Sequence, residues 1–117
     1  ILLGPGSFMT SVMPPLLVSG IRNALLTTNA KVVFIDNLAD ESGPAGAMSL
    51  ADKVSFIEKQ LGQQIIDLAL SNKKEKDLKL PVIGGLESDK DVHYRHNTSN
   101  LLAKLQEASK QLLTESA

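Results

Sequence analysis

The chain has 117 residues, of which 43% are hydrophobic, and a formal net charge of −1. This length fits a single domain with a core of its own, and the charge lacks the excess of Lys and Arg that marks nucleic-acid binders. With no Cys and two His, the sequence offers no disulfide, no thiol nucleophile and no thiolate metal site. We therefore expect no nucleic-acid partner and no resident metal.

The apolar runs are only a few residues long, whereas a bilayer span needs about 20. No basic and then apolar signal segment precedes them. We expect a cytoplasmic protein with no membrane partner.

The first third of the chain predicts a strand, a broken helix and a second strand. Residues 1–3 form the end of a buried strand that runs into a glycine turn. Pro15 restricts Pro14 to extended geometry, which argues against one continuous helix from residue 7 onward. The second part of this helix spans residues 20–28, where apolar residues recur at helical spacing. Residues 32–35, Val-Val-Phe-Ile, are typical of a strand covered on both faces.

The middle third predicts a loop, a helix and a strand. Residues 39–47 carry Gly and Pro without periodicity, as loops do. Ser49 is followed three residues later by Asp52, a pattern that caps helices. The helix continues with an apolar residue at each turn and ends at Gly62. Residues 65–70 fit a further strand.

The last third is less regular until its final helix. The charged run 73–77 is interpreted as a solvated loop. Residues 81–85 fit either a short edge strand or irregular structure, and residues 92–95 either a short strand or an extended entry to a helix. That helix begins at a cap formed by Asn97 and lines one stripe with leucines as far as Leu113.

Strands and helices alternate along the whole chain. Such alternation predicts an α/β fold, with a Rossmann-like, mostly parallel sheet and helices on both faces, built by residues 1–117 as a single α/β domain.

Ligands of open parallel sheets bind outside the carboxyl ends of the strands, where residues 4–11, 36–46 and 94–97 would meet. The first segment fits a phosphate cradle or simply a tight turn that needs glycine for its dihedral angles. Asp36 and Asn37 fit a ribose, base or metal-water contact, although a capping pair explains them as well.

Arg95 stands between His93, Tyr94 and His96. Its fork of donors fits a clamp for phosphate or carboxylate, and a plain surface arginine is the alternative. No Ser, His and Asp arrangement and no pair of carboxylates marks acid/base catalysis.

Several short motifs, in order, make the family recognisable. The chain reads Gly-Pro-Gly-Ser-Phe-Met-Thr-Ser at 4–11, Pro-Pro-Leu-Leu-Val at 14–18, Asp-Asn-Leu at 36–38, Ser-Leu-Ala-Asp-Lys at 49–53 and Tyr-Arg-His at 94–96. It resembles the carboxyl-terminal half of the CofD-like family. That family includes 2-phospho-lactate transferases of deazaflavin-coenzyme synthesis and the bacterial YvcK-type gluconeogenesis factors, and this chain is more similar to the second group.

The resemblance implies a Rossmann-like fold and a nucleotide-linked small molecule bound across both halves of a longer protein. We therefore expect this chain to be a carboxyl-terminal fragment that forms a homo-oligomer or associates with the missing amino-terminal half. The ligand is a UDP-sugar in a regulator of the YvcK type, tied to carbon metabolism and cell-wall shape. The alternatives are a guanine-nucleotide donor in a transferase, or a dimerisation or scaffold half without its own ligand.

The same resemblance implies which residues form the site. Those that match the family motifs are Gly4, Gly6, Ser7, Thr10, Ser11, Asn37 and Arg95. No catalytic residue and no cofactor is assigned; a transferase would use Mg²⁺, for which Asp36 is the best ligand. Two departures bear on specificity. Residues 39–44 read Ala-Asp-Glu-Ser-Gly-Pro instead of the family's Met-Thr-Gln-x-Gly-Glu, and Asn97 replaces an Asp.

Overall fold

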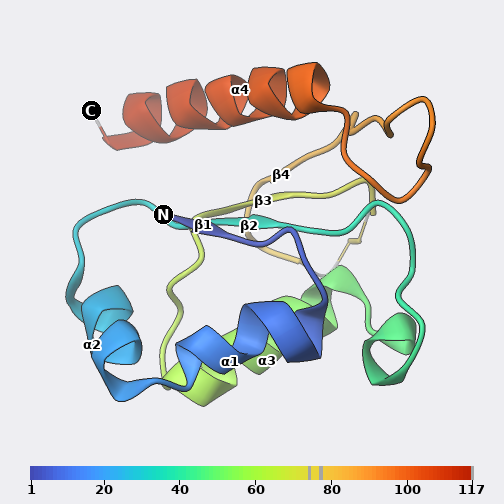
Figure 1. Cartoon of the computed structure of the whole chain (residues 1–117). Helices are drawn as coiled ribbons and strands as arrows, with labels where there is room; N and C mark the ends of the chain where they lie inside the picture. The colour runs from blue at the N-terminus through green and yellow to red at the C-terminus, as the bar shows by residue number, and fades with distance from the viewer. Residues whose placement is uncertain (74, 77, 117) are drawn as a thin grey trace.

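In the computed structural model, which describes residues 1–73, 75–76 and 78–116, the strands form one parallel sheet in chain order (Figure 1). All three neighbouring pairs are parallel. The strands are β1 (Leu2–Leu3), β2 (Val33–Ile35), β3 (Leu68–Leu70) and β4 (Val82–Ile83).

Helices cover both faces of this sheet (Figure 1). Three lie on one face, namely α1 (Met13–Leu16), α2 (Ser19–Thr27) and α3 (Leu50–Leu61), and α4 (Thr98–Ser116) lies on the other. The α/β fold class and the parallel sheet with helices on both faces are confirmed. Within the described residues, no helix combines the length and apolar character that crossing a bilayer requires.

Each face of the sheet has its own core, because side chains along a strand alternate between faces. Phe34 of β2 and Ala69 of β3 belong to the core under α1, α2 and α3. Val33 and Ile35 of β2 belong with Leu70 of β3 to the core under α4. Both faces are therefore apolar, which is why β2 is the continuous hydrophobic run that the sequence shows.

The ends of α3 are where the capping pattern predicts them. The backbone N–H of Asp52 donates to the Ser49 hydroxyl at 3.0 Å, and the N–H of Ser49 donates to the Asp52 carboxylate at 3.0 Å. Gly62 ends the helix with φ +81°.

The two-proline segment differs from its prediction. The chain makes one turn of π-helix over Phe8–Val12 and continues directly into α1, so Pro14 is helical and not extended. Prolines are accepted in the first turn of an α-helix because the N–H groups there have no intrahelical partner. The helix is in two parts as expected, but the break follows the prolines, at Leu17 and Val18.

Three other segments resolve or shift their predictions. Residues 81–85 contain the edge strand β4, whereas β3 is shorter than the predicted 65–70. Residues 92–95 form a turn, closed by a 3.1 Å hydrogen bond from the Arg95 N–H to the Val92 carbonyl, and not a strand. In the charged run 73–77, residues 74 and 77 lie outside the described residues.

Candidate functional site

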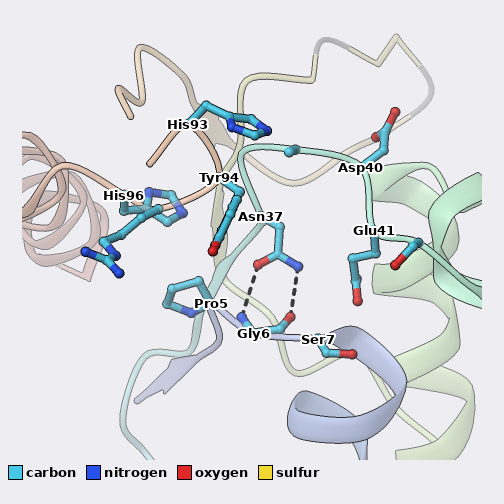
Figure 2. A pocket seen from close by; sticks show the side chains of 12 residues that line it. Pro5, Gly6, Ser7, Asn37, Asp40, Glu41, His93, Tyr94 and His96 are labelled. Carbon is cyan, nitrogen blue, oxygen red and sulfur yellow. Dashed lines mark hydrogen bonds between the residues drawn. The ribbon is translucent and has the colours of Figure 1, made fainter. Parts of the chain in front are cut away.

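A pocket of about 670 Å³ opens at the carboxyl ends of β1 and β2 (Figure 2). Three segments meet there: the glycine turn after β1, the loop after β2 and the turn before α4. The convergence expected for a parallel sheet is therefore present. The lining residues are Pro5, Gly6, Ser7, Asn37, Ala39, Asp40, Glu41, Ser42, His93, Tyr94, Arg95 and His96.

Four of the seven residues predicted for the site line this pocket, namely Gly6, Ser7, Asn37 and Arg95. Gly4 and Ser11 instead line an apolar groove along β1, and Thr10 is not among the lining residues of the pocket. The Thr10 hydroxyl donates to the Ser7 hydroxyl at 2.7 Å, so it orients a lining side chain.

Gly4 lies outside the pocket lining, in the turn that follows β1. Its φ is +85°, and a Cβ at this position would lie 2.6 Å from the backbone oxygen of Ile35. Only glycine avoids both the strained dihedral angle and this close approach. The interpretation of Gly4 as a residue that the turn itself requires therefore has direct structural support.

Asn37 ties the two strand ends together. The N–H of Gly6 donates to Asn37 Oδ1 at 3.1 Å, and Asn37 Nδ2 donates to the Gly6 carbonyl at 2.9 Å (Figure 2). The side-chain amide thus pairs with the backbone of Gly6 through one donor and one acceptor, as a neighbouring strand would. Asn37 fixes the pocket floor through these two bonds and acts as a positioning residue.

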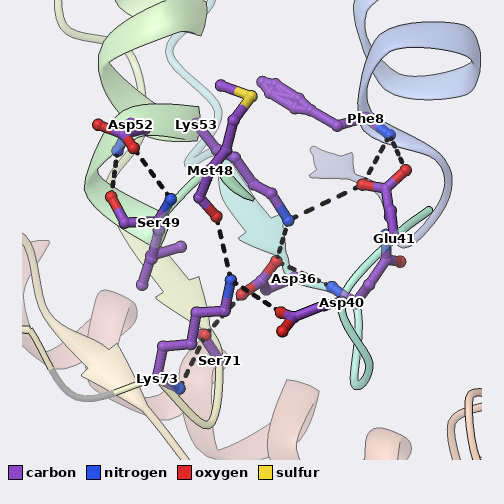
Figure 3. A network of polar contacts seen from close by, with 12 residues as sticks. Phe8, Asp36, Asp40, Glu41, Met48, Ser49, Asp52, Lys53, Ser71 and Lys73 are labelled. Carbon is purple, nitrogen blue, oxygen red and sulfur yellow. Dashed lines mark hydrogen bonds and ion pairs between the residues drawn. The ribbon is translucent and has the colours of Figure 1, made fainter. Parts of the chain in front are cut away.

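Behind the pocket lies a buried polar network that the sequence analysis did not identify (Figure 3). Lys53 Nζ lies 2.9 Å from Asp36 Oδ1, and the Ser71 hydroxyl donates to Asp36 Oδ2 at 2.8 Å. The side chains of Lys53 and Asp36 are 5% and 1% exposed. Both Asp36 oxygens are engaged, and Asp36 is not among the residues that line the pocket. The expectation that Asp36 would hold Mg²⁺ therefore gains no support from this geometry and stays a prediction.

A signal for this network exists in the sequence. Lys53 follows Leu50 by three residues and precedes Ile57 by four, so it shares the buried face of α3. A lysine on an apolar helical face needs a buried carboxylate partner. Asp36, at the end of a buried strand, was the acid available for it.

Glu41 completes the wall between the pocket and this network. The N–H of Phe8 donates to Oε1 at 3.0 Å and to Oε2 at 3.2 Å, and Lys53 Nζ lies 3.9 Å from Oε2. The Phe8 N–H, one of the donors expected to face a phosphate, therefore already holds a carboxylate.

The turn before α4 supplies the aromatic and basic side of the pocket. His93 and Tyr94 pack edge to face, with ring centroids 5.5 Å apart, and Tyr94 is 64% exposed and reaches toward the Pro5–Gly6 turn (Figure 2). Arg95 is exposed, and within the described part of the chain its guanidinium has no ion-pair partner. A cation and an aromatic ring are thus both free to meet a ligand.

His96 anchors this turn to the sheet. Its Nε2 lies 3.1 Å from the carbonyl oxygen of Asp36, which can only accept, so Nε2 carries the proton. Nδ1 is buried and has no hydrogen-bond partner among the residues that the structure describes. His96 therefore holds Arg95 and Tyr94 over the pocket.

Comparison with known proteins agrees with the resemblance seen in the sequence. A family model described as 2-phospho-L-lactate transferase CofD matches residues 1–113. This chain belongs to the CofD family. It is 42% identical over 106 residues to a "Putative gluconeogenesis factor" of Pasteurella multocida, covering 86% of this chain and 34% of that protein. A protein of the same name from Yersinia pestis is 38% identical over 120 residues, covering 96% and 38%.

A solved structure carries the same fold. A UPF0052-family protein of Bacillus halodurans matches with a TM-score of 0.73 and 28% identity, over 92% of this chain and 42% of that one. The CofD-family chain thus spans less than half the length of the relatives it matches.

Proposed function

We propose that this CofD-family chain forms part of the binding site for a nucleotide-linked sugar, of the UDP-sugar kind, in a regulatory gluconeogenesis factor tied to carbon metabolism and cell-wall shape. The observation that carries the proposal is the pocket at the strand ends, where Arg95 stands without an ion-pair partner in the described residues. Guanidinium groups pair with phosphate oxygens through two parallel hydrogen bonds. A diphosphate would meet Arg95 and the Ser7 hydroxyl, which accepts from Thr10 and keeps its own proton to donate. The N–H groups of Gly6 and Phe8 already donate to protein partners, so they do not add to this contact.

A nucleotide-linked sugar also needs an apolar surface for its base or sugar ring, and Tyr94 offers one beside Arg95. Tyr94 is 64% exposed and is braced by the edge of His93. Aromatic rings of this kind stack on bases and on the apolar faces of sugars. The relatives named "Putative gluconeogenesis factor" support the assignment to a gluconeogenesis factor, and the pocket offers such a protein a place to hold a ligand.

The alternative is a transferase that moves a phospho-lactate-type group from a nucleotide donor to an acceptor hydroxyl. The description of the matching family model and the presence of Asp40 and Glu41 on the pocket wall favour it. Mg²⁺ is often held by one or two carboxylates together with substrate phosphates. Here the exposed Asp40 would hold it, and Glu41 would join only by giving up its contact with the Phe8 N–H. The ion would neutralise charge on a transferring phosphoryl group. In the described part of the chain, no three His, Cys, Asp or Glu side chains form a cage for a metal on their own.

A partner surface completes the proposal. β1 is an edge strand, and its residue Leu2 and the neighbouring Ile1 are 54% and 48% exposed. Exposed apolar edges are covered in stable proteins. The rest of a longer protein, or a second copy, would cover this one, in line with the lengths of the relatives.

The Arg95 contact is tested by isothermal titration of the natural full-length protein with UDP-N-acetylglucosamine. Arg95→Ala is expected to weaken binding by about 1–3 kcal/mol, the usual loss for a charge-assisted hydrogen bond. Arg22→Ala is the matched control, because Arg22 is exposed on α2 and is absent from the pocket lining. Equal affinities of the two variants, with both folded, would remove Arg95 from the site.

A further inference from the structure

The pocket wall carries a negative charge at the place where a phosphate is expected. Glu41 lies on the loop after β2, and its carboxylate accepts from the Phe8 N–H with both oxygens. The side chain is 13% exposed and lines the pocket, as Figures 2 and 3 show from two sides. Any ligand at the Gly6–Ser7 turn would therefore approach this carboxylate.

The charge of Glu41 is not cancelled by its neighbours. Lys53 is the nearest cation, but it lies 2.9 Å from Asp36 and 3.9 Å from Glu41. One buried ammonium thus faces two carboxylates, and the shorter contact belongs to Asp36. Asp40, the next residue on the pocket wall, pairs with Lys73 at 3.7 Å and is 76% exposed. Among these residues three carboxylates face two ammonium groups, so this part of the wall, without Arg95, carries an excess of one negative charge.

This excess affects phosphate groups according to their own charge. A terminal phosphate that carries nothing else holds about two negative charges near pH 7, whereas one esterified by a sugar holds about one. Like charges placed side by side in a partly buried site weaken binding strongly. A free nucleoside diphosphate would be penalised more than its sugar ester, although the ester is the larger ligand.

We propose that Glu41 is a specificity-determining residue that makes the pocket favour nucleoside diphosphates esterified on the terminal phosphate over free nucleoside diphosphates. The inference rests on the proposed function of the pocket. Arg95 attracts the free form more strongly than the ester, so the selection requires the terminal phosphate to lie nearer to Glu41 and the inner phosphate nearer to Arg95. The Phe8 N–H and Lys53 already hold the selecting carboxylate in place.

The test compares UDP with UDP-N-acetylglucosamine on the natural full-length protein, by isothermal titration at low ionic strength, where charges are screened least. Glu41→Gln removes the charge but keeps an oxygen for the Phe8 N–H, so the loop keeps its hydrogen bond. The variant is expected to raise the affinity for UDP about tenfold more than that for the sugar ester, the effect of about one unit charge at the wet rim of a pocket.

Two further variants separate charge from structure. Glu41→Asp keeps the charge and should keep the preference for the ester. Glu107→Gln removes one negative charge from α4, outside the pocket lining, and should leave the preference unchanged. Thermal melting of each variant shows whether it is folded.

The outcomes distinguish the inference from the proposal beneath it. If both nucleotides bind and Glu41→Gln leaves their affinity ratio as in the unchanged protein, the inference is overturned and the proposed function stands. If neither nucleotide binds either protein, the proposed function is overturned and the inference falls with it. A ratio that shifts toward UDP in Glu41→Gln alone supports both.

Discussion

Replacing Lys53 by methionine tests whether the buried network stabilises the fold. Methionine keeps the length and much of the volume of the side chain but lacks the ammonium. The variant leaves Asp36, 1% exposed, facing an apolar group where it had a cation at 2.9 Å. Breaking a buried pair in this way costs about 3–5 kcal/mol, because a buried charge loses its partner.

The remaining partners of Asp36 reduce this loss of stability. Asp36 keeps the Ser71 hydroxyl at 2.8 Å and the backbone N–H of Asn37 at 3.0 Å, and each remaining hydrogen bond stabilises the carboxylate. We expect Lys53→Met to destabilise the fold by about 2–4 kcal/mol. For a domain of this size that corresponds to a drop in melting temperature of roughly 8–16 °C.

Urea denaturation followed by circular dichroism measures this difference. Lys104→Met is the control, since Lys104 and Glu107 form a surface pair at 3.4 Å with side chains 25% and 55% exposed. An exposed pair contributes at most about 1 kcal/mol. If the Lys53 variant loses no more stability than the Lys104 variant, the buried network does not support the fold and the reasoning is wrong.

Two other predictions concern stability away from the network. Gly4→Ala should lower the free energy of unfolding by about 2–4 kcal/mol in urea denaturation, because it combines a φ of +85° with a Cβ 2.6 Å from a backbone oxygen. Gly20→Ala, in open space within α2, is the control and should be neutral or stabilising. Equal effects of the two substitutions on stability would contradict this reasoning. Burial raises the pKa of Glu58 above 4.5, although the N–H groups of Ile65 and Ile66 oppose the shift. The folded state therefore holds this proton more tightly than the unfolded state, and the stability so gained is lost as pH rises from about 4.5 through the raised pKa. Thermal melting from pH 4 to pH 7 should show the protein losing stability relative to Glu58→Gln over that range, and a relative gain would refute the assignment.

Elements set by local patterns could be predicted from the sequence. The apolar run of β2 and the Ser49 cap of α3 depend on neighbours in the chain, and both lie where the sequence places them. The prediction of an extended Pro14 was wrong, because the preference of a residue before proline for extended geometry is overridden in the first turn of α1. Residues 92–95 were predicted as a short strand or an extended entry to α4, but they form a turn, and three of them, His93, Tyr94 and Arg95, line the pocket.

In the candidate site too, local patterns indicate some residues, whereas others depend on contacts between distant parts of the chain. Gly6, Ser7, Asn37 and Arg95 belong to motifs or follow strands, and the structure places them in the pocket lining. Their contact with a ligand stays a prediction. Glu41 was missed because its position depends on contacts across more than thirty residues of sequence, which no local pattern contains. Lys53 could have been suspected from its place on the buried face of α3, but not its partner distances.

The most direct test of the account is isothermal titration of the natural full-length protein with UDP-N-acetylglucosamine and with GDP, each with and without Mg²⁺. The account predicts that the UDP-sugar binds with an affinity that does not depend on Mg²⁺ and is recovered unchanged. Binding of GDP that requires Mg²⁺, without binding of the UDP-sugar, would contradict it and would favour the transferase.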